Sequence, residues 1–413
     1  MNDDLSRRAF IQKSTLVAAS GLAKGTIAQA AGPELVNPHP LLTPANAFNT
    51  VARGNPKPHS LTGQDAIHAR LTPESWRLEI TADPFTEKDH VAHPASIQRA
   101  LTLAGGNAID LPMLTELGKT HGVKFIKAMQ CLNIPTPLGQ GLWEGVPLRE
   151  VLRLCGKLHN VRRIYYYGFH NNDPKQVFQS SVSYTEAMET PPDELPVFLA
   201  YKLNGEPISL LRGGPVRMVV PWAYGFKSIK WLQHIFVTND YRANDTYALQ
   251  NNDPESHLKT AAYADGGPKT FKAGEPLVLT GQVIAGRSGL KRVEYGVRSV
   301  RDAIEALADD HPELLRGPWI PCPLLPPPDW KQSLPAGNTT RDILGFDPST
   351  GQPTSWPLPY GMASFAVDLR GLKPGTYEVR FRAVDRNDFA QPEPRPLQKS
   401  GKNALDVRRF EVV

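Results

Sequence analysis

The 413-residue sequence contains only three cysteines, Cys131, Cys155 and Cys322, and none belongs to a CxxC or CxxCH motif. These absences exclude a zinc ribbon, a thioredoxin-like dithiol and a covalently attached c-type haem, and they allow at most one disulfide. No long run of lysine and arginine occurs and the net charge is only +5, so we expect no binding to nucleic acid. The sequence also lacks an internal repeat and an apolar run suited to a stable membrane span.

The chain is too long for one ordinary hydrophobic core, so we expect two domains after an N-terminal extension. Its 39 prolines favour a β-rich architecture with many loops over a helical bundle. Hydrophobic residues make up 40% of the chain and charged residues 21%. This composition is typical of a soluble globular protein.

Residues 1–30 have the pattern of a twin-arginine (Tat) export signal. Arg7 and Arg8 precede a weakly apolar stretch at 14–27, and a small-x-small cleavage site follows at 28–30. The stretch contains Lys24 and several glycines, so it is too polar for a membrane span. Tat substrates are exported folded, often because a cofactor is inserted first. We therefore expect a periplasmic protein with a complex cofactor.

Residues 31–262 alternate short strands with amphipathic segments, which is typical of an α+β domain. Residues 31–70 are rich in Pro, His and Asn and are expected to form an extended, wrapping segment. A helix is predicted at 147–154, with proline near its start and Gly156 at its end. The predicted strands of this part are 76–80, 123–126, 161–167, 197–201 and 216–220.

The pattern changes after residue 262, and we interpret the Gly/Pro/Lys-rich stretch at 264–269 as a domain boundary. Alternating strands separated by turn residues indicate an immunoglobulin-like β-sandwich over 263–413, with a Pro-rich insertion near 301–360. A hairpin-type turn is predicted at 373–376. The predicted strands of the sandwich are 276–284, 291–295, 364–368 and 377–384.

Cys131 follows the apolar run 123–126 and precedes a loop rich in Pro and Gly at 134–141. A thiol at the end of a strand can serve as a soft metal ligand or a nucleophile, but an isolated cysteine is more often a small buried hydrophobe. Cys155, on the predicted helix, and Cys322, in the insertion, are interpreted as structural.

A second constellation lies at 211–231, where Arg212 and Arg217 flank a Gly-Gly-Pro turn and Lys227 and Lys230 follow in a glycine-containing loop. Guanidinium groups suit bidentate binding of phosphate, and a glycine-bearing loop lets backbone N–H groups approach an anion. Each residue alone also fits a strand with solvated charges at its ends. Their combination favours an anion site.

The stretch 211–231 and the segment around Cys131 together resemble the sulfite oxidase family of molybdopterin-dependent enzymes. The resemblance covers roughly residues 45–413, and the last part resembles that family's dimerisation domain. It implies a mixed α/β molybdopterin-binding domain followed by an immunoglobulin-like β-sandwich. It also implies Mo-molybdopterin as the cofactor and oxygen-atom transfer to sulfite or a related sulfur compound.

The resemblance assigns the molybdenum thiolate ligand to Cys131 and a place facing the oxyanion pocket to Arg53. The tyrosine of the family's active site would fall near Tyr241 or Tyr247, of which we prefer Tyr247. The remaining residues implied as cofactor contacts are Asn49, Ala52, Arg53, Gly168, Phe169, His170, Arg212, Arg217, Ser228, Ile229 and Lys230.

One departure concerns 132–136, where the family carries an arginine and this sequence does not. His170 and Lys227 are the candidates to supply the missing cation. Trp143 either lines the pocket or packs in the core, and we favour packing.

The predicted protein is a periplasmic oxidoreductase and a homodimer. It binds a small anionic sulfur substrate and passes electrons to a separate acceptor such as cytochrome c. Two alternatives remain: an enzyme resembling protein-methionine-sulfoxide reductases, and a non-catalytic assembly module. A third alternative is that Cys131 only packs in the hydrophobic core and binds no metal.

Overall fold

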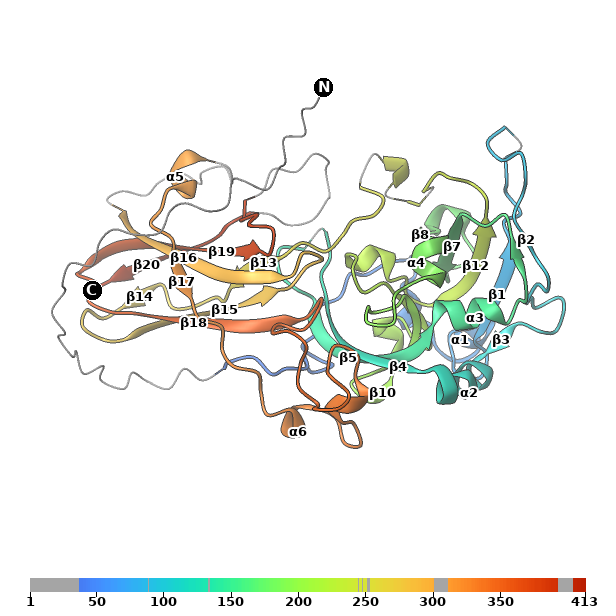
Figure 1. Cartoon of the computed structure of the whole chain (residues 1–413), viewed down its shortest axis with the longest axis horizontal. Coiled ribbons are helices and arrows are strands. Elements are labelled where there is room, and N and C mark those ends of the chain that lie inside the picture. Colours follow the sequence, from blue (N-terminus) through green and yellow to red (C-terminus); the bar gives the residue numbers. More distant parts are fainter. Residues whose placement is uncertain are drawn as a thin grey trace, which may run out of the picture. The chain divides into compact units, whose positions relative to one another are not determined.

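The computed structural model describes residues 37–87, 89–132, 134–243, 245–246, 248–250, 253–300, 311–392 and 404–413. The predicted export signal at 1–30 lies outside these ranges, and so does Tyr247. Within them, none of the helices combines the length and the apolar character that a membrane span requires. Mixed sheets with short helices are followed along the chain by a β-sandwich (Figure 1), which confirms the predicted fold class.

The first part contains two sheets. In the first, with strand order β3-β1-β12-β7-β8, only β1 and β12 run parallel. Its strands are β1 (Arg77–Ala82), β3 (Ile109–Asp110), β7 (Arg163–Gly168), β8 (Gln179–Ser183) and β12 (Leu232–Thr238). The second sheet has the order β10-β9-β5-β4, and β11 also pairs with β9. Its strands are β4 (Val123–Met129), β5 (Gly139–Pro147), β9 (Phe198–Leu203), β10 (Glu206–Pro207) and β11 (Arg217–Val219), while β2 (Ser96–Ile97) pairs with β6 (Leu158–His159).

Short helices connect and cover these strands. The Asp110 side chain accepts a hydrogen bond from the Met113 amide at 2.8 Å and so caps the helix that begins beside it. Ser183 and Glu186 form a capping box at another helix start. The α-helices are α1 (Gly63–His68), α2 (Leu111–His121), α3 (Leu148–Arg153) and α4 (Tyr184–Met188), and the 3-10 helices are η1 (Pro58–Ser60), η2 (Pro174–Gln176), η3 (Leu210–Arg212), η4 (Gly225–Lys227) and η5 (Ala248–Gln250).

A large apolar core fills the first part, because strands and helices each turn an apolar face toward it. Trp76, Leu114 and Tyr166 are fully buried there, as is Cys155 directly after α3. Burial raises the pKa of the Cys155 thiol to about 11, so it stays protonated and inert.

The second part is a β-sandwich of two sheets, with the strand orders β13-β15-β18 and β14-β20-β19-β16-β17. Phe365 and Phe381 face each other across its core with ring centroids 5.1 Å apart, and both are fully buried. Its strands are β13 (Ala261–Ala264), β14 (Thr270–Phe271), β15 (Leu277–Ile284), β16 (Leu290–Val300), β17 (Ile320–Cys322), β18 (Met362–Leu369), β19 (Gly375–Asp385) and β20 (Asp406–Val412).

The hairpin-type turn predicted at 373–376 is wrong. β18 and β19, which this segment connects, belong to different sheets, so the connection crosses from one sheet to the other. The crossing places Phe365 and Phe381 on the facing sides of the two sheets, where their rings pack against each other in the core. The stretch 264–269 likewise connects two strands of the sandwich, β13 and β14.

Part of the insertion packs against the first part of the chain. Leu344 forms a bridge with Phe125 on β4, and its amide donates to the carbonyl oxygen of Lys124 at 2.8 Å. Further along β4, Ile126 is part of the same buried hydrophobic cluster as Phe346 of the insertion. This contact covers the edge of β4, the strand that leads to Cys131. The helices described in the insertion are α5 (Pro312–Leu315), α6 (Trp330–Ser333) and η6 (Thr340–Asp342).

Candidate functional site

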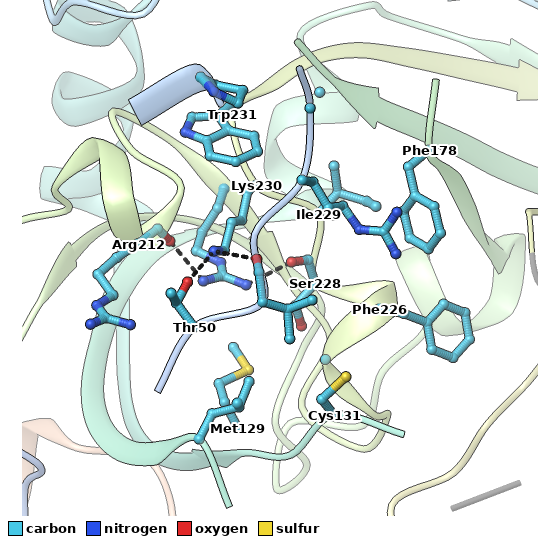
Figure 2. A pocket seen from close by; sticks show the side chains of 18 of the residues that line it. Thr50, Met129, Cys131, Phe178, Arg212, Phe226, Ser228, Ile229, Lys230 and Trp231 are labelled. Atoms are coloured by element: carbon cyan, nitrogen blue, oxygen red, sulfur yellow. Dashed lines mark hydrogen bonds between the residues drawn. The ribbon is translucent and has the colours of Figure 1, made fainter. Parts of the chain in front are cut away.

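A cavity of about 1070 Å³, its open mouth included, collects most of the residues predicted from the sequence. Its walls come from seven segments: the wrapping segment 48–58, the end of β4, residues 138–143 at the start of β5, the end of β7, residues 176–178 before β8, residues 212–217 up to the start of β11, and residues 225–231 in and after η4 (Figure 2). The predicted residues that line it are Asn49, Arg53, Cys131, Gly168, Phe169, His170, Arg212, Arg217, Ser228, Ile229 and Lys230.

Cys131 lies at the cavity because the backbone around it is held by hydrogen bonds. The Gly225 amide donates to the carbonyl oxygen of Gln130 at 2.7 Å. The buried Gln130 side chain donates to the carbonyl oxygens of Cys131 and Ile134 at 2.9 and 2.8 Å. Cys131 forms no disulfide and is 9% exposed. The thiol is therefore fixed in the wall of the cavity.

Arg212 fastens the wrapping segment to the cavity wall. Its buried guanidinium donates to the carbonyl oxygens of Phe48 and Asn49 at 2.6 and 2.9 Å, and to that of Ala45 at 3.2 Å. Burial lowers the pKa of Arg212. These bonds explain why a segment without regular structure lines the site.

Arg217 is buried behind the same wall. Its two terminal nitrogens donate to the carbonyl oxygens of Arg212 and Ser228, both at 2.7 Å, while its buried Nε has no hydrogen-bond partner among the residues that the structure describes. Burial and then the charge of Arg212 lower the pKa of Arg217 to about 9. A buried guanidinium with one donor unused is an expensive arrangement unless an anion completes it.

Lys230 adds a third cation beside these two arginines. Its ammonium donates to Thr50 Oγ1 at 2.9 Å and to the Leu211 carbonyl oxygen at 3.1 Å (Figure 2). Burial, followed by the charges of Arg217, Arg212 and Arg53, lowers the pKa of Lys230 to about 7. None of the residues lining the cavity is Asp or Glu, so this positive charge is uncompensated within the described part of the protein.

Arg53 and His170 lie at other places on the lining. The Arg53 guanidinium carbon is 3.4 Å from the ring centroid of Phe178, a close cation–π stack. His170 contacts Tyr167 edge-on with ring centroids 5.8 Å apart, and burial lowers the pKa of His170. A Cβ on Gly168 would overlap the carbonyl oxygen of Lys230, so glycine is required for this close approach of β7.

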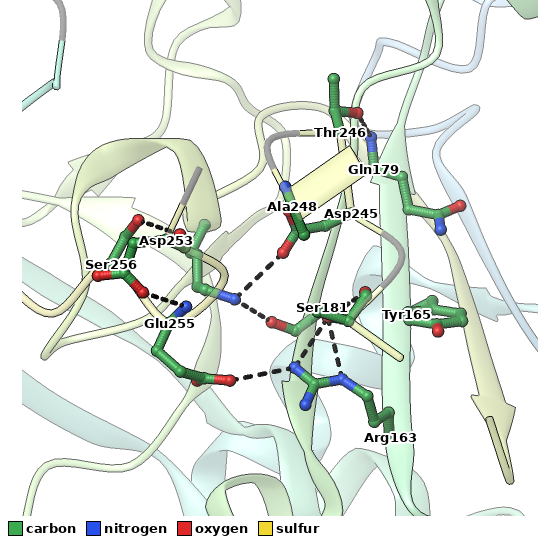
Figure 3. A network of polar contacts seen from close by, with 12 residues as sticks. Arg163, Tyr165, Gln179, Ser181, Asp245, Thr246, Ala248, Asp253, Glu255 and Ser256 are labelled. Atoms are coloured by element: carbon green, nitrogen blue, oxygen red, sulfur yellow. Dashed lines mark hydrogen bonds and ion pairs between the residues drawn. The ribbon is translucent and has the colours of Figure 1, made fainter. Parts of the chain in front are cut away.

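Lys227, a candidate for the missing cation, does not line the cavity. It is fully buried, and its ammonium donates to the Ser181 carbonyl oxygen at 2.6 Å and to Asp245 at 3.4 Å, two residues of the polar network that Figure 3 shows. Beside it, Arg163 donates to Ser181 Oγ and to Glu255. Lys227 is thus part of a buried network that supports η4, and of the two candidates only His170 faces the cavity.

The structure leaves a few predicted residues outside the site. Ala52 does not line the cavity, although Val51 and Arg53 on either side of it do. Tyr241 is 62% exposed and does not line it either, while Tyr247 lies outside the described residues. Trp143 both lines the cavity and packs in an apolar cluster, where it is 1% exposed.

Sequence reasoning missed most of the apolar lining. Phe178 lies on the connection between η2 and β8, and no local pattern separates it from a core residue. Phe226 could have been found, because it stands inside the stretch 211–231. The apolar lining residues outside the prediction are Phe48, Val51, Pro58, Met129, Leu138, Phe178, Phe226 and Trp231.

Comparison with known proteins identifies the domain that holds this cavity. Residues 108–246 match the family model of the oxidoreductase molybdopterin binding domain. Over 204 residues the chain is 35% identical to nitrate reductase 2 (NADH) of Phaseolus vulgaris, covering 44% of this chain and 21% of that protein. Mitochondrial sulfite oxidase of Drosophila melanogaster is 27% identical over 186 residues, or 44% of this chain and 30% of that protein. Sulfite oxidase of Arabidopsis thaliana is 25% identical over 200 residues, or 42% and 51%.

The matched region thus spans about half the length of these relatives or less. The fold is similar to that of the sulfane dehydrogenase SoxCD from Paracoccus pantotrophus, with a TM-score of 0.54 over 86% of both chains at 15% identity. Residues 108–246 are thus an oxidoreductase molybdopterin binding domain, and this part of the chain is similar to the corresponding part of sulfite oxidases and nitrate reductases.

The cavity fits Mo-molybdopterin, the cofactor of this family. The uncompensated cations and the unused Arg217 Nε suit the anionic phosphate of the pterin. No three His, Cys, Asp or Glu side chains gather as a metal cage among the described residues. The thiolate of Cys131, which lines the cavity, is a suitable soft ligand for a pterin-bound metal.

Proposed function

We propose that this protein is a periplasmic molybdenum oxidoreductase that oxidises sulfite or a related small sulfur compound. The observation that carries the proposal is the thiol of Cys131 in a cavity whose cations, Arg212, Arg217 and Lys230, have no carboxylate partner within the described part of the chain. Such a cavity attracts an anionic cofactor and an anionic substrate, and it repels cations.

The chain's own residues would hold and orient the reactants. Cys131 would bind the metal through its thiolate, and Arg217 and Lys230, with Ser228 and Ile229, would bind the pterin and its phosphate. Arg212 would contribute its charge while its N–H groups hold the wrapping segment. Bound in this way, the cofactor supplies the two-electron redox chemistry, and the protein supplies position and electrostatics.

Arg53 is the cation that we assign to the substrate. Its guanidinium stacks on Phe178 in the cavity lining, where its positive charge attracts an oxyanion. His170 lines the same cavity as a second polar group. Its lowered pKa favours the neutral imidazole, which can either donate or accept a hydrogen bond.

We also propose the cellular setting from the sequence. The twin arginines at 7 and 8 and the cleavage site at 28–30 support export to the periplasm. The absence of a CxxCH motif in the sequence supports a separate electron acceptor, such as a cytochrome c. The β-sandwich supports a homodimer, because it resembles the dimerisation domain of the family.

Reduction of a nitrogen oxyanion is a second candidate, because proteins named nitrate reductases are among the relatives. A cationic cavity suits nitrate as well as sulfite. Reduction of a sulfoxide is the other reductive alternative. A sulfoxide is uncharged, so the positive charge of the cavity favours it less than it favours an anion. The direction of electron flow distinguishes both from the main proposal.

A turnover screen of protein loaded with molybdenum cofactor tests the proposal. We expect reduction of cytochrome c with sulfite, and no oxidation of reduced viologen with nitrate or methionine sulfoxide. The Cys131→Ser variant should lose the sulfite activity. Turnover of nitrate or a sulfoxide without turnover of sulfite would contradict the proposal, and so would sulfite activity that survives in Cys131→Ser.

A further inference from the structure

The cavity is divided by polarity into two halves. One half contains Arg212, Arg217 and Lys230 with Thr50, whose hydroxyl accepts from the Lys230 ammonium. The other half surrounds Cys131 and is mainly apolar. Figure 2 shows Arg212 and Thr50 on one side of the cavity and Phe178 and Phe226 on the other, the side nearer Cys131.

The apolar half is built from two hydrophobic clusters that both contribute to the cavity lining, as Cys131 does. Met129, two residues before the cysteine, belongs to a cluster that Leu138 also packs against, and the Leu138 amide donates to the Met129 carbonyl oxygen at 2.7 Å. Phe226 belongs to the other cluster, and Phe178 packs against that one. These four apolar side chains give the lining a surface that water hydrates poorly.

Arg53 is the charged group of this half. It stacks on Phe178 at 3.4 Å, and its charge also reaches Lys230, whose pKa it lowers. The apolar half thus offers one guanidinium next to two aromatic rings. A fully hydrated dianion or monoanion such as sulfite uses the guanidinium but gains nothing from the rings. An anion with an apolar substituent uses both.

We propose that the preferred substrate class is an organic sulfinate, R–SO₂⁻, whose anionic head meets Arg53 and whose apolar group R packs between Phe178 and Phe226. The inference rests on the proposed function and narrows it. A sulfinate, like sulfite, carries a lone pair on sulfur and a negative charge, and it adds an apolar group.

The reaction balances as R–SO₂⁻ + H₂O → R–SO₃⁻ + 2 H⁺ + 2 e⁻. One sulfur–oxygen bond forms with the sulfur lone pair, and the two O–H bonds of one water molecule break. The sulfinate sulfur is oxidised, and the two electrons leave, by way of the cofactor, to two equivalents of a one-electron acceptor. The protons leave to solvent, and the product is a sulfonate with the same apolar group.

Steady-state kinetics of the cofactor-loaded full-length protein with benzenesulfinate and with sulfite test this inference, with ferricyanide as the one-electron acceptor. We expect kcat/KM for benzenesulfinate to be at least about tenfold above that for sulfite, since a buried apolar group is worth about one to two orders of magnitude in selectivity. Phe178→Ala and Phe226→Ala should each lower the ratio of the two kcat/KM values by about tenfold. Phe178→Leu should restore most of the ratio, and it remains informative if an alanine variant fails to fold.

Binding measured by calorimetry gives a readout that does not depend on turnover. Benzenesulfonate, the product, should bind at least about tenfold more tightly than sulfate, and Phe178→Leu should weaken it less than Phe178→Ala. Phe389→Ala is the matched control, because Phe389 is 56% exposed in the β-sandwich and outside the cavity lining. It should leave both ratios unchanged.

The outcomes separate this inference from the proposed function. Turnover of sulfite with a lower kcat/KM for benzenesulfinate would overturn the inference and leave the proposed function standing. Loaded protein that turns over neither compound would overturn both. A ratio that is equally reduced in Phe389→Ala would overturn the role of the two rings.

Discussion

The β-sandwich and the cavity differ in whether a buried carboxylate accompanies their arginines. In the sandwich, Glu378 is fully buried and accepts hydrogen bonds from Arg298 and Arg409 at 2.8 and 3.1 Å. In the cavity, Arg212 and Arg217 bond only to carbonyl oxygens among the described residues. Paired charges are explained by the protein itself, whereas unpaired buried charges require something that the protein binds. Cations without a carboxylate partner therefore indicate the position of the binding site better than a count of all cations does.

Glu294 shows the same pairing in the sandwich. Burial acts to raise the pKa of Glu294, but hydrogen bonds from Arg292 and Arg382 outweigh it and lower that pKa. The cations of the cavity show the reverse, since their pKa values fall through burial and mutual repulsion. Glu294 and Glu378 of the sandwich are thus paired with arginines of the protein itself, whereas the cavity lining contains cations and no carboxylate.

Cys131→Ser should have the largest effect. We expect loss of the metal and a fall in turnover beyond the roughly 10–100-fold that loss of a supporting residue costs. Molybdenum content by plasma mass spectrometry and sulfite-dependent reduction of cytochrome c measure both. Cys155→Ala is the control, since that thiol is buried in the core of the first part. Retention of molybdenum and turnover in Cys131→Ser would contradict the assignment.

Arg217→Met and Glu378→Gln should change the unfolding free energy of the cofactor-free protein in opposite directions. Arg217→Met removes an uncompensated buried charge, so the cofactor-free protein should gain about 1–3 kcal/mol in unfolding free energy while cofactor retention falls. Glu378→Gln should lose about 1–3 kcal/mol with unchanged cofactor retention. Urea unfolding and molybdenum content measure these effects. A loss of stability in cofactor-free Arg217→Met would show that its carbonyl contacts, and not a bound anion, justify the buried charge.

The stability of the cofactor-free protein should rise with pH between about 7 and 9. The lysine pKa is lowered from 10.5 to about 7 in the folded state, so in this range the unfolded chain binds a proton that folded Lys230 has lost. Lys127, whose pKa burial and then Arg217 also lower to about 7, adds to the slope. We expect about 1 kcal/mol per pH unit for each group.

Urea unfolding at pH 7, 8 and 9 measures this slope, and Lys230→Met should remove part of it. Lys119→Met is the control, because that side chain is 73% exposed. Cofactor-loaded protein should show a smaller slope, since a bound anion raises the lysine pKa again. An identical slope in Lys230→Met and in the unchanged protein would exclude Lys230 as its source.

Tyr241→Phe should have the smallest effect, because Tyr241 is exposed and outside the cavity lining. We expect kcat/KM with sulfite to stay within about twofold, the range of a typical surface substitution. Tyr247→Phe tests the tyrosine preferred from the sequence and should lower kcat more than Tyr241→Phe does. The reverse order would move the assignment to Tyr241.

Local patterns predicted the elements of this fold more reliably than their pairing. The alternation of polar and apolar residues located β15, β18 and β19, and the apolar run before Cys131 located β4. The turn after β18 was wrongly predicted to be a hairpin. A Pro-Gly turn fits a hairpin and a connection between two sheets equally well, so the turn residues alone do not distinguish them. Which strand pairs with which depends on the two faces that must share a core, and no short segment encodes that.

In the site, too, local segments were predicted well and contacts between distant segments were not. The cysteine and the arginines stand in recognisable segments, so most predicted residues line one cavity. The cavity-facing role of Phe178 and the buried role of Lys227 depend on packing between distant segments. Both were beyond the reach of local sequence.

The cover over β4 has a consequence for the order in which the protein matures. Lys124 and Ala128 on β4 accept and donate backbone hydrogen bonds to Leu344 and Tyr360, more than 200 residues later in the chain. During synthesis, the strand that carries Cys131 to the cavity therefore waits for the C-terminal third before its edge is closed. Contacts this distant in sequence form late in folding. The support of the strand before Cys131 is accordingly completed only when residues 344–360 have been made.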